Sequence, residues 1–119
     1  MAMKLGSICF DCPDPATLAQ FYSQLTDWPI VRDDGDWIEL DTGNEVVLSL
    51  QLAPDHVPPR WPNPSAPQQA HLDLMVDDMD AEHAHALDLG AKLLDDSAEH
   101  PTFRVFADPA GHPFCLCRG

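Results

Sequence analysis

The chain has 119 residues, a length typical of one domain that buries a core without disulfides or metals. Its 20 Asp and Glu residues against 6 Lys and Arg give a formal net charge of −14, which argues against nucleic acid or an anionic membrane surface as a partner. No stretch is apolar enough to span a membrane, and the N-terminus lacks the apolar run of a secretory signal. We therefore expect a cytoplasmic protein whose four cysteines are reduced.

The first half of the chain predicts a strand, a helix and three further strands. The first strand, over residues 4–11, precedes Asp14 and Pro15, which are typical of the N-cap and first position of a helix. Apolar residues at helical spacing carry that helix to about Leu25. Short strands follow over residues 28–33, 36–40 and 45–52, separated by turn residues. This half is a βαβββ module.

A proline-rich linker, residues 53–69, holds six of the chain's 12 prolines. After it the pattern restarts. We expect a strand over residues 71–76, a helix that begins after Asp78 and ends near Leu89, and strands over residues 91–95, 102–107 and 113–117. The second half is therefore another βαβββ module.

Superposition of the two halves indicates an internal duplication. Ser7 falls on His71 at an offset of 64 residues (71 − 7), and residues 37–41 fall on residues 104–108 at an offset of 67 (104 − 37). We expect a single α+β domain in which two βαβββ modules, about residues 4–52 and 70–118, form a curled mixed sheet, or half-barrel, around a cleft.

Alternation along the strands assigns each side chain to one of two faces, and we expect the helices to cover the apolar face. The opposite face mixes polar and aromatic residues and is expected to line the cleft. Its predicted members are Ser7, Cys9, Asp11, Trp37, Glu39, Val47, Ser49, Gln51, His71, Asp73, Met75, Arg104, Phe106, Cys115 and Cys117.

The same alternation separates the cysteines. Cys9 and Cys12 lie on opposite faces of one strand, so they neither chelate one metal nor form a disulfide, and their Cys-x-x-Cys spacing is coincidental. Cys115 and Cys117 share the cleft face. On the second helix, His83 and His85 are two residues apart and are expected to point into solvent.

Several features together resemble the vicinal oxygen chelate superfamily, which comprises glyoxalase I, the fosfomycin- and bleomycin-resistance proteins and the extradiol dioxygenases. They are the duplicated βαβββ plan and the segments DPATLAQFYSQLTDW, AHLDLMVDDMDAEHAHALDLGAKLL and VFADPAGHPFCL. The resemblance covers essentially the whole chain and points to the small glyoxalase-like branch. It implies a homodimer, and in the enzymes a divalent metal held by His, Gln or Glu from the first, fourth, fifth and eighth strands.

At the positions that this resemblance implies, the sequence has Ser7, then Ser49 or Val47, then His71 and Cys115. Of these, His71 alone is a usual ligand for such a cation, so we expect no complete metal site and no cofactor. A soft-metal site built from Cys9, His71, Cys115 and Cys117 is an alternative that lacks the usual zinc spacing.

Two functional classes follow. In the first, resembling the bleomycin-resistance members, the cleft binds a small organic molecule without metal. Its predicted ligand-binding residues are Ser7, Trp37, Ser49, Gln51, His71, Asp73, Arg104, Phe106 and Cys115. In the second, the protein is an enzyme: a divalent-metal-dependent lyase, isomerase or dioxygenase, or a metal-free enzyme with His71 as general acid or base.

Two of these residues have alternative roles. Arg104 either binds an anionic or carbonyl-bearing ligand or pairs with Glu39 or Asp73. Trp37 either stacks on a planar ligand or caps the mouth of the barrel.

Overall fold

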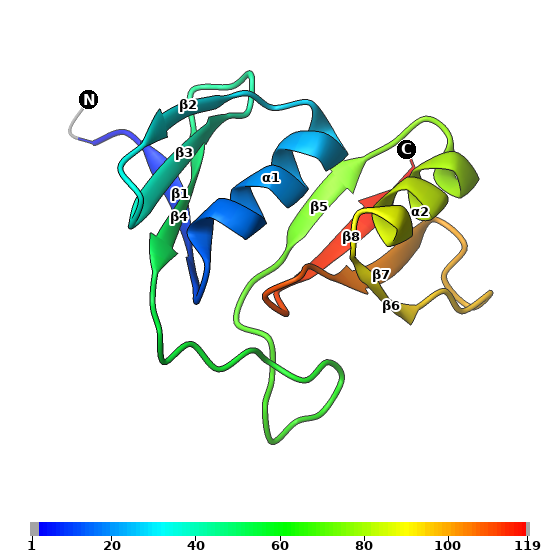
Figure 1. The fold of residues 1–119 in the computed structure, drawn as a ribbon. Helices are drawn as coiled ribbons and strands as arrows, with labels where there is room; N and C mark the ends of the chain where they lie inside the picture. Colours follow the sequence, from blue (N-terminus) through cyan, green and yellow to red (C-terminus); the bar gives the residue numbers. More distant parts are fainter. Residues whose placement is uncertain (1–2, 119) are drawn as a thin grey trace. The chain divides into compact units, whose positions relative to one another are not determined.

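The computed structural model describes residues 3–118. They divide into two compact units, with the boundary in the sequence between His56 and Val57 (Figure 1). Each unit contains one four-stranded mixed sheet and one helix. The predicted α+β fold of two βαβββ modules is confirmed, with every predicted element present in the predicted order. That the sheets curl around a cleft stays a prediction of the sequence.

The first unit begins with β1 (Ser7–Cys12) and α1 (Pro15–Thr26), and its other strands are β2 (Ile30–Asp33), β3 (Trp37–Asp41) and β4 (Val47–Leu52). The strand order in the sheet is β1-β4-β3-β2, and β1 runs parallel to β4. As predicted, Asp14 caps α1, since its carboxylate accepts a hydrogen bond from the Thr17 amide at 3.2 Å.

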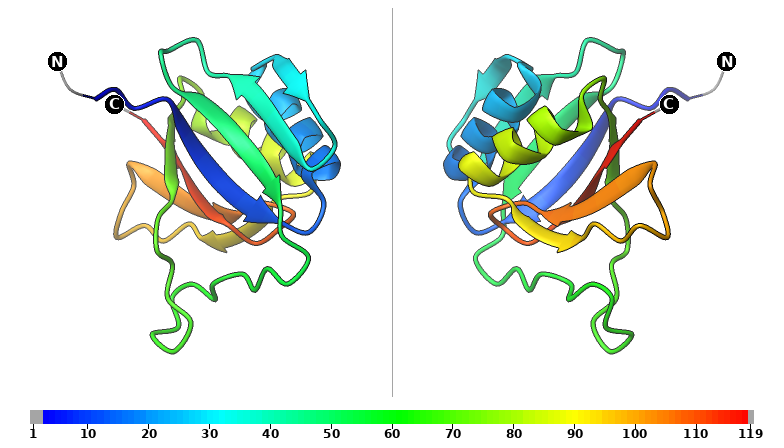
Figure 2. Two further views of the ribbon diagram at one scale, coloured as in Figure 1. Left: turned by 90° about the vertical axis from the view of Figure 1, so that its left-hand side faces the viewer. Right: turned by 90° about the vertical axis from the view of Figure 1, so that its right-hand side faces the viewer.

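Helix α1 packs on β3 and β4, and Figure 2 shows it across one face of the sheet. Its buried side chains recur at helical spacing and include Leu18, Phe21, Tyr22 and Leu25. Ile38, Leu40, Leu48 and Leu50 are also buried, at alternate positions of β3 and β4. The predicted faces of the first sheet are therefore correct.

The second unit repeats the plan with β5 (Leu72–Met75), α2 (Met79–Asp88), β6 (Lys92–Asp95), β7 (Phe103–Ala107) and β8 (Pro113–Cys117). The strand order is β5-β8-β7-β6, with β5 parallel to β8. Asp78 caps α2 as predicted, and α2 packs on β8. In the sequence between β4 and β5, residues 53–71 contain short turns and irregular segments but no helix or strand.

The predicted faces of β7 are wrong. Strand pairing places Arg104 opposite Leu116 and Phe106 opposite Phe114, and directly paired residues share a face. Arg104 and Phe106 therefore lie on the α2 side of the sheet. The other face takes Phe103 and Val105, which pair with Cys117 and Cys115.

The offset predicted for this part of the duplication carries the same error. In the structure β7 matches β3 at an offset of 66 residues (103 − 37), and β8 matches β4 at the same offset, since Ser49 and Cys115 are equivalent (115 − 49). The offset of 67 is one residue too long. A slip of one residue exchanges the two faces of a strand.

Candidate functional site

The face of each sheet away from its helix, called here the helix-free face, carries most of the predicted site. In the first unit it presents side chains from β1, β3 and β4. They are Ser7, Cys9, Asp11, Trp37, Glu39, Val47, Ser49 and Gln51, placed by the strand pairing as the alternation predicts.

Ser7 and Ser49 form a pair on this face. Their hydroxyl groups are hydrogen-bonded to each other, and Ser49 is fully buried. Each hydroxyl thus already has a partner, and neither carries a charge. Val47, the other residue considered for the fourth-strand position, is apolar and directly opposite Ser7.

Trp37 and Glu39 form a second group. The indole Nε1–H of Trp37 donates to Glu39 Oε2 at 2.8 Å, and Arg32 lies 3.8 Å from the same carboxylate oxygen. The half-buried Trp37 ring is therefore held by a hydrogen bond at its polar edge. An indole fixed in this way is suited to stack on a planar group.

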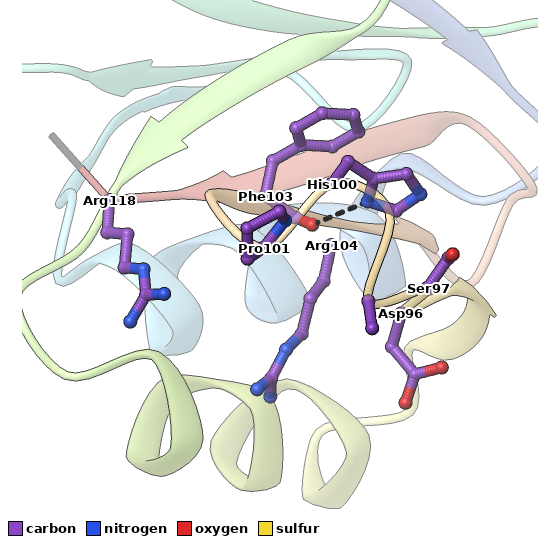
Figure 3. Close-up of a pocket in the computed structure, with 8 residues that line it drawn as sticks. Asp96, Ser97, His100, Pro101, Phe103, Arg104 and Arg118 are labelled. Carbon is purple, nitrogen blue, oxygen red and sulfur yellow. Dashed lines mark hydrogen bonds between the residues drawn. The ribbon is translucent and has the colours of Figure 1, made fainter.

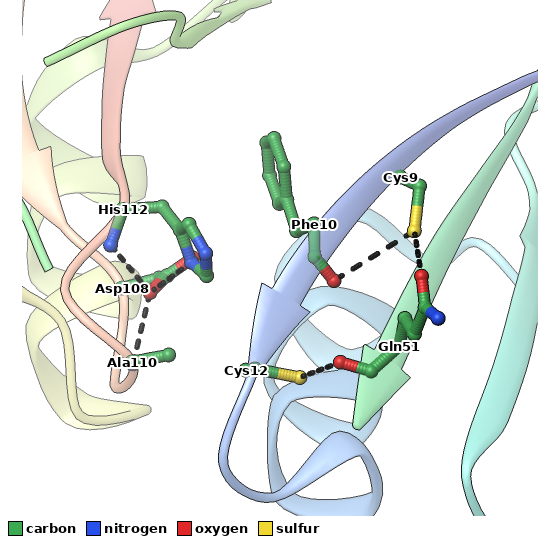
Figure 4. Close-up of polar contacts among 7 residues, drawn as sticks. All are labelled: Cys9, Phe10, Cys12, Gln51, Asp108, Ala110 and His112. Carbon is green, nitrogen blue, oxygen red and sulfur yellow. Dashed lines mark hydrogen bonds and ion pairs between the residues drawn. The ribbon is translucent and has the colours of Figure 1, made fainter. Parts of the chain in front are cut away.

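Cys9 and Gln51 lie side by side on β1 and β4 (Figure 4). The Cys9 thiol donates to Gln51 Oε1 at 3.8 Å, whereas the Cys12 thiol donates to the Gln51 carbonyl from the buried side of the sheet. The two cysteines are on opposite faces, as the sequence predicts. Burial and, secondarily, the charge of Asp11 raise the pKa of Cys9.

In the second unit, His71, Asp73 and Cys115 come together. His71 Nε2 lies 3.1 Å from Asp73 Oδ1, and Asp73 pairs with Cys115 across β5 and β8. One donor atom from each of the three residues lies within 4.8 Å of the other two. His71 and Asp73 are exposed and Cys115 is buried, so this cluster borders solvent on one side.

The thiols of this face are held in their protonated form. Burial, the charge of Asp73 and the neighbouring Cys117 raise the pKa of Cys115 to about 12, and burial and Asp73 also raise the pKa of Cys117. At neutral pH neither group supplies a nucleophilic thiolate. A bound cation would have to displace the proton before Cys115 served as its ligand.

Arg104 and Phe106, on the α2 side, make contacts that the sequence did not predict. The Arg104 guanidinium lies 3.0 Å from Asp80 Oδ1 and 2.8 Å from His83 Nδ1. Its expected partners, Glu39 or Asp73, are therefore wrong. Phe106 is fully buried, with the His83 ring edge-on at 5.1 Å.

Half-buried His83 likewise contradicts its predicted exposure to solvent. The spacing of Asp80 and His83 on one helical face could have signalled a shared partner.

Sequence reasoning also missed a buried ion pair in the turn before β8 (Figure 4). His112 Nδ1 lies 2.8 Å from Asp108 Oδ2, and the side chain of Asp108 is fully buried. Asp108 also accepts hydrogen bonds from the amides of Ala110 and His112, both at 2.9 Å. The signal that could have indicated this contact is an Asp four residues before a His in the segment DPAGH.

The two modules can be compared position by position. Ser7 is equivalent to His71, and Ser49 is equivalent to Cys115. The resemblance implied a metal ligand at each of the four positions. Two mutually hydrogen-bonded hydroxyls do not fit that role, because hard or borderline cations are held by imidazole and carboxylate groups. A four-ligand site drawn from both modules is therefore not supported by the donor set.

Comparison with known proteins gives a consistent picture. A family model described as a glyoxalase-like domain matches residues 7–117. The fold is similar to that of a glyoxalase/bleomycin resistance protein/dioxygenase family enzyme from Burkholderia phytofirmans, with a TM-score of 0.79, 17% identity and 98% of each chain covered. No curated protein matches the sequence.

Two further solved structures share the fold. A fosfomycin resistance protein from Mesorhizobium loti matches with a TM-score of 0.75 and 16% identity, over 100% of this chain and 94% of that one. An antibiotic binding protein from a Streptomyces species matches with a TM-score of 0.67 and 23% identity, over 99% and 98%. Within residues 3–118, both helices are too short and polar to cross a membrane.

Proposed function

Because the chain belongs to the glyoxalase-like domain family, we propose that it binds a small organic molecule on its helix-free faces without a complete metal site. The observation that carries the proposal is the Ser7–Ser49 hydroxyl pair. These two serines occupy the positions in the first module at which the family resemblance implies metal ligands. Two solved structures of the same fold support the proposal, because one is described as an antibiotic binding protein and the other as a fosfomycin resistance protein.

The polar and aromatic groups of these faces supply the binding chemistry. Trp37 offers a ring surface, and the exposed Gln51 offers an amide beside it on the paired strand. On the second sheet, His71 and Asp73 offer a donor and an acceptor that are partly open to solvent. A ligand with a planar body and a few polar substituents matches this set. Arg104 and Phe106 are no longer part of it.

A Trp37→Ala variant tests the stacking contact. We expect it to raise the Kd of a planar ligand about tenfold, since a stacking contact contributes roughly 0.5–1.5 kcal/mol beyond its buried area. The ligand is first found by thermal-shift screening of aromatic antibiotics, and its Kd is then measured by calorimetry. Val31→Ala, at an exposed position on β2, is the control. An unchanged Kd in Trp37→Ala would remove stacking from the proposal.

An enzyme is the second candidate, and the His71–Asp73–Cys115 cluster favours it. The three donors would hold a divalent cation within the second unit alone and leave a position open for a Lewis-acid role. Without a metal, the Asp73 carboxylate would orient the His71 imidazole as a general acid or base.

Metal content after dialysis against Zn²⁺, Mn²⁺ and Fe²⁺ decides whether the cluster takes a cation. If the main proposal holds, mass spectrometry finds well below one metal ion per chain. The metal content of His71→Ala is then the same as that of the unchanged protein. Near-stoichiometric metal that is lost in both His71→Ala and Asp73→Ala, but kept in the control Asp77→Ala, would instead support the metal enzyme.

We further propose that the protein is a homodimer, as the family resemblance implies, and that it is cytoplasmic, as its sequence predicts. All four cysteines are free thiols in the structure, which is the state expected in a reducing compartment. The dimer is tested at the scale of the whole molecule below.

A further inference from the structure

A pocket lies in the second unit, beside the loop that joins β6 to β7 (Figure 3). Its volume is about 250 Å³. The lining residues come from that loop and from the adjoining ends of β7 and β8: Asp96, Ser97, Ala98, His100, Pro101, Phe103, Arg104 and Arg118. It shares Phe103 alone with the helix-free face of the second sheet.

The loop over this pocket is held by polar and ring contacts among its own residues and β7. His100 Nε2 lies 3.0 Å from Asp95 Oδ2, and His100 Nδ1 lies 3.1 Å from the Phe103 carbonyl oxygen. The imidazole also stacks on the Phe103 ring at 4.2 Å. Asp95 further accepts from the Ser97 amide at 2.9 Å. The wall of the pocket is therefore formed before any ligand arrives.

The pocket gathers positive charge in a strongly acidic chain. Two of the 6 Lys and Arg residues, Arg104 and Arg118, line it, and their guanidinium groups point to the same side of β7 in Figure 3. The side chain of Arg118 has no hydrogen bond or ion pair with any other residue of the described chain, 3–118.

Arg104 is anchored by Asp80 and His83, which use one N–H of each terminal nitrogen. Its remaining donors stay available, because a guanidinium has five.

We propose that this pocket binds a small organic monocarboxylate, whose carboxylate is bound by Arg118 and Arg104 and whose apolar part lies against Pro101. The guanidinium fork of Arg118 matches the two oxygens of a carboxylate, and Arg104 adds positive charge and further donors to the same pocket. The volume is below the roughly 300–1,000 Å³ of sites for drug-sized ligands, so the acid is small. Asp96 in the same lining, together with the net charge of −14, disfavours a second negative charge on the ligand.

Titration with sodium benzoate, followed by amide NMR shifts at constant ionic strength, tests the site. We expect saturable shifts confined to residues 96–104 and 118. Arg118→Gln should raise the Kd about tenfold, as expected for loss of a charged hydrogen-bonding partner. Lys92→Gln removes an equal charge from β6, outside the pocket lining, and should leave the Kd unchanged.

Four results would overturn the inference. Shifts that grow without saturation, or an unchanged Kd in Arg118→Gln, would show that benzoate binds only by unspecific charge attraction. Shifts centred on the helix-free face would assign benzoate to the proposed ligand site instead. Inorganic phosphate binding as tightly as benzoate would exclude a carboxylate-specific pocket. Because Trp37 takes no part, the pocket and the proposed function stand or fall separately.

Discussion

At the scale of single residues, neighbours determine what each side chain is able to do. Cys115 and Cys117 share one face of the sheet, as the sequence predicts, and burial together with one carboxylate, Asp73, keeps both thiols protonated at neutral pH. The sequence predicted their common face but not the effect of Asp73 on their pKa values. That effect depends on the pairing of β5 with β8, which brings together residues 42 positions apart (115 − 73).

Removal of the Asp73 charge should make the thiols more reactive. Its carboxylate raises the pKa of Cys117, so Asp73→Asn should lower that pKa and shift the pH profile of iodoacetamide alkylation to lower pH. The pKa should stay above its ordinary value, because burial is the larger cause. Alkylation of Cys117 is followed by mass spectrometry. Asp77→Asn, an equal charge change at an exposed position, serves as the control; identical profiles for the two variants would contradict the assignment.

At the scale of elements, hydrophobic spacing and capping residues predicted every helix and strand. The side-chain faces of β7 were predicted wrongly, because TFRVFA places an aromatic residue on each face and so fits either orientation. Its Arg104 was therefore assigned to the ligand site. The contact of Arg104 with Asp80 and His83 joins a strand to a helix that lies 21 to 24 residues earlier. The spacing of Asp80 and His83 indicates a shared partner, but it does not identify Arg104 as that partner.

The turn before β8 holds the proline-rich segment by direct contact. Gly111 has a φ of +95°, and a Cβ added there would lie 2.4 Å from the Cβ of Pro58. We expect Gly111→Ala to lower the free energy of unfolding by about 2–4 kcal/mol, from backbone strain plus overpacking.

Gly90→Ala is the matched control, since its φ is +107° but its added Cβ would meet Pro109 only at 4.0 Å. That variant should lose about 1–2 kcal/mol, the backbone cost alone. Urea denaturation measures both. Equal losses would mean that the contact with Pro58 contributes nothing.

At the scale of the whole molecule, charge dominates. Each chain carries −14, so a homodimer would carry −28 (2 × −14) and its association would be opposed by long-range repulsion. Salt weakens that repulsion, since the Debye length falls from about 30 Å at 0.01 M to about 8 Å at 0.15 M.

Sedimentation velocity at these two ionic strengths tests the proposed dimer. We expect a dimer at 0.15 M salt and a larger monomer fraction at 0.01 M, because repulsion between the acidic chains is then unscreened. Glucose at matched osmolarity controls for effects other than screening. A monomer under both conditions would refute the dimer.

The matched positions of the two sheets also have an evolutionary consequence. A duplicated backbone lets one copy change its side chains while the other retains its chemistry, as the serine pair of one module and the His71 and Cys115 of the other illustrate. The sequence of each module therefore shows which residue types the equivalent positions of the other module can accommodate. Ser7→His combined with Ser49→Cys would copy two of the second module's three donors, His71 and Cys115, into the first module. Both substitutions introduce residue types that the same backbone already carries at the equivalent positions.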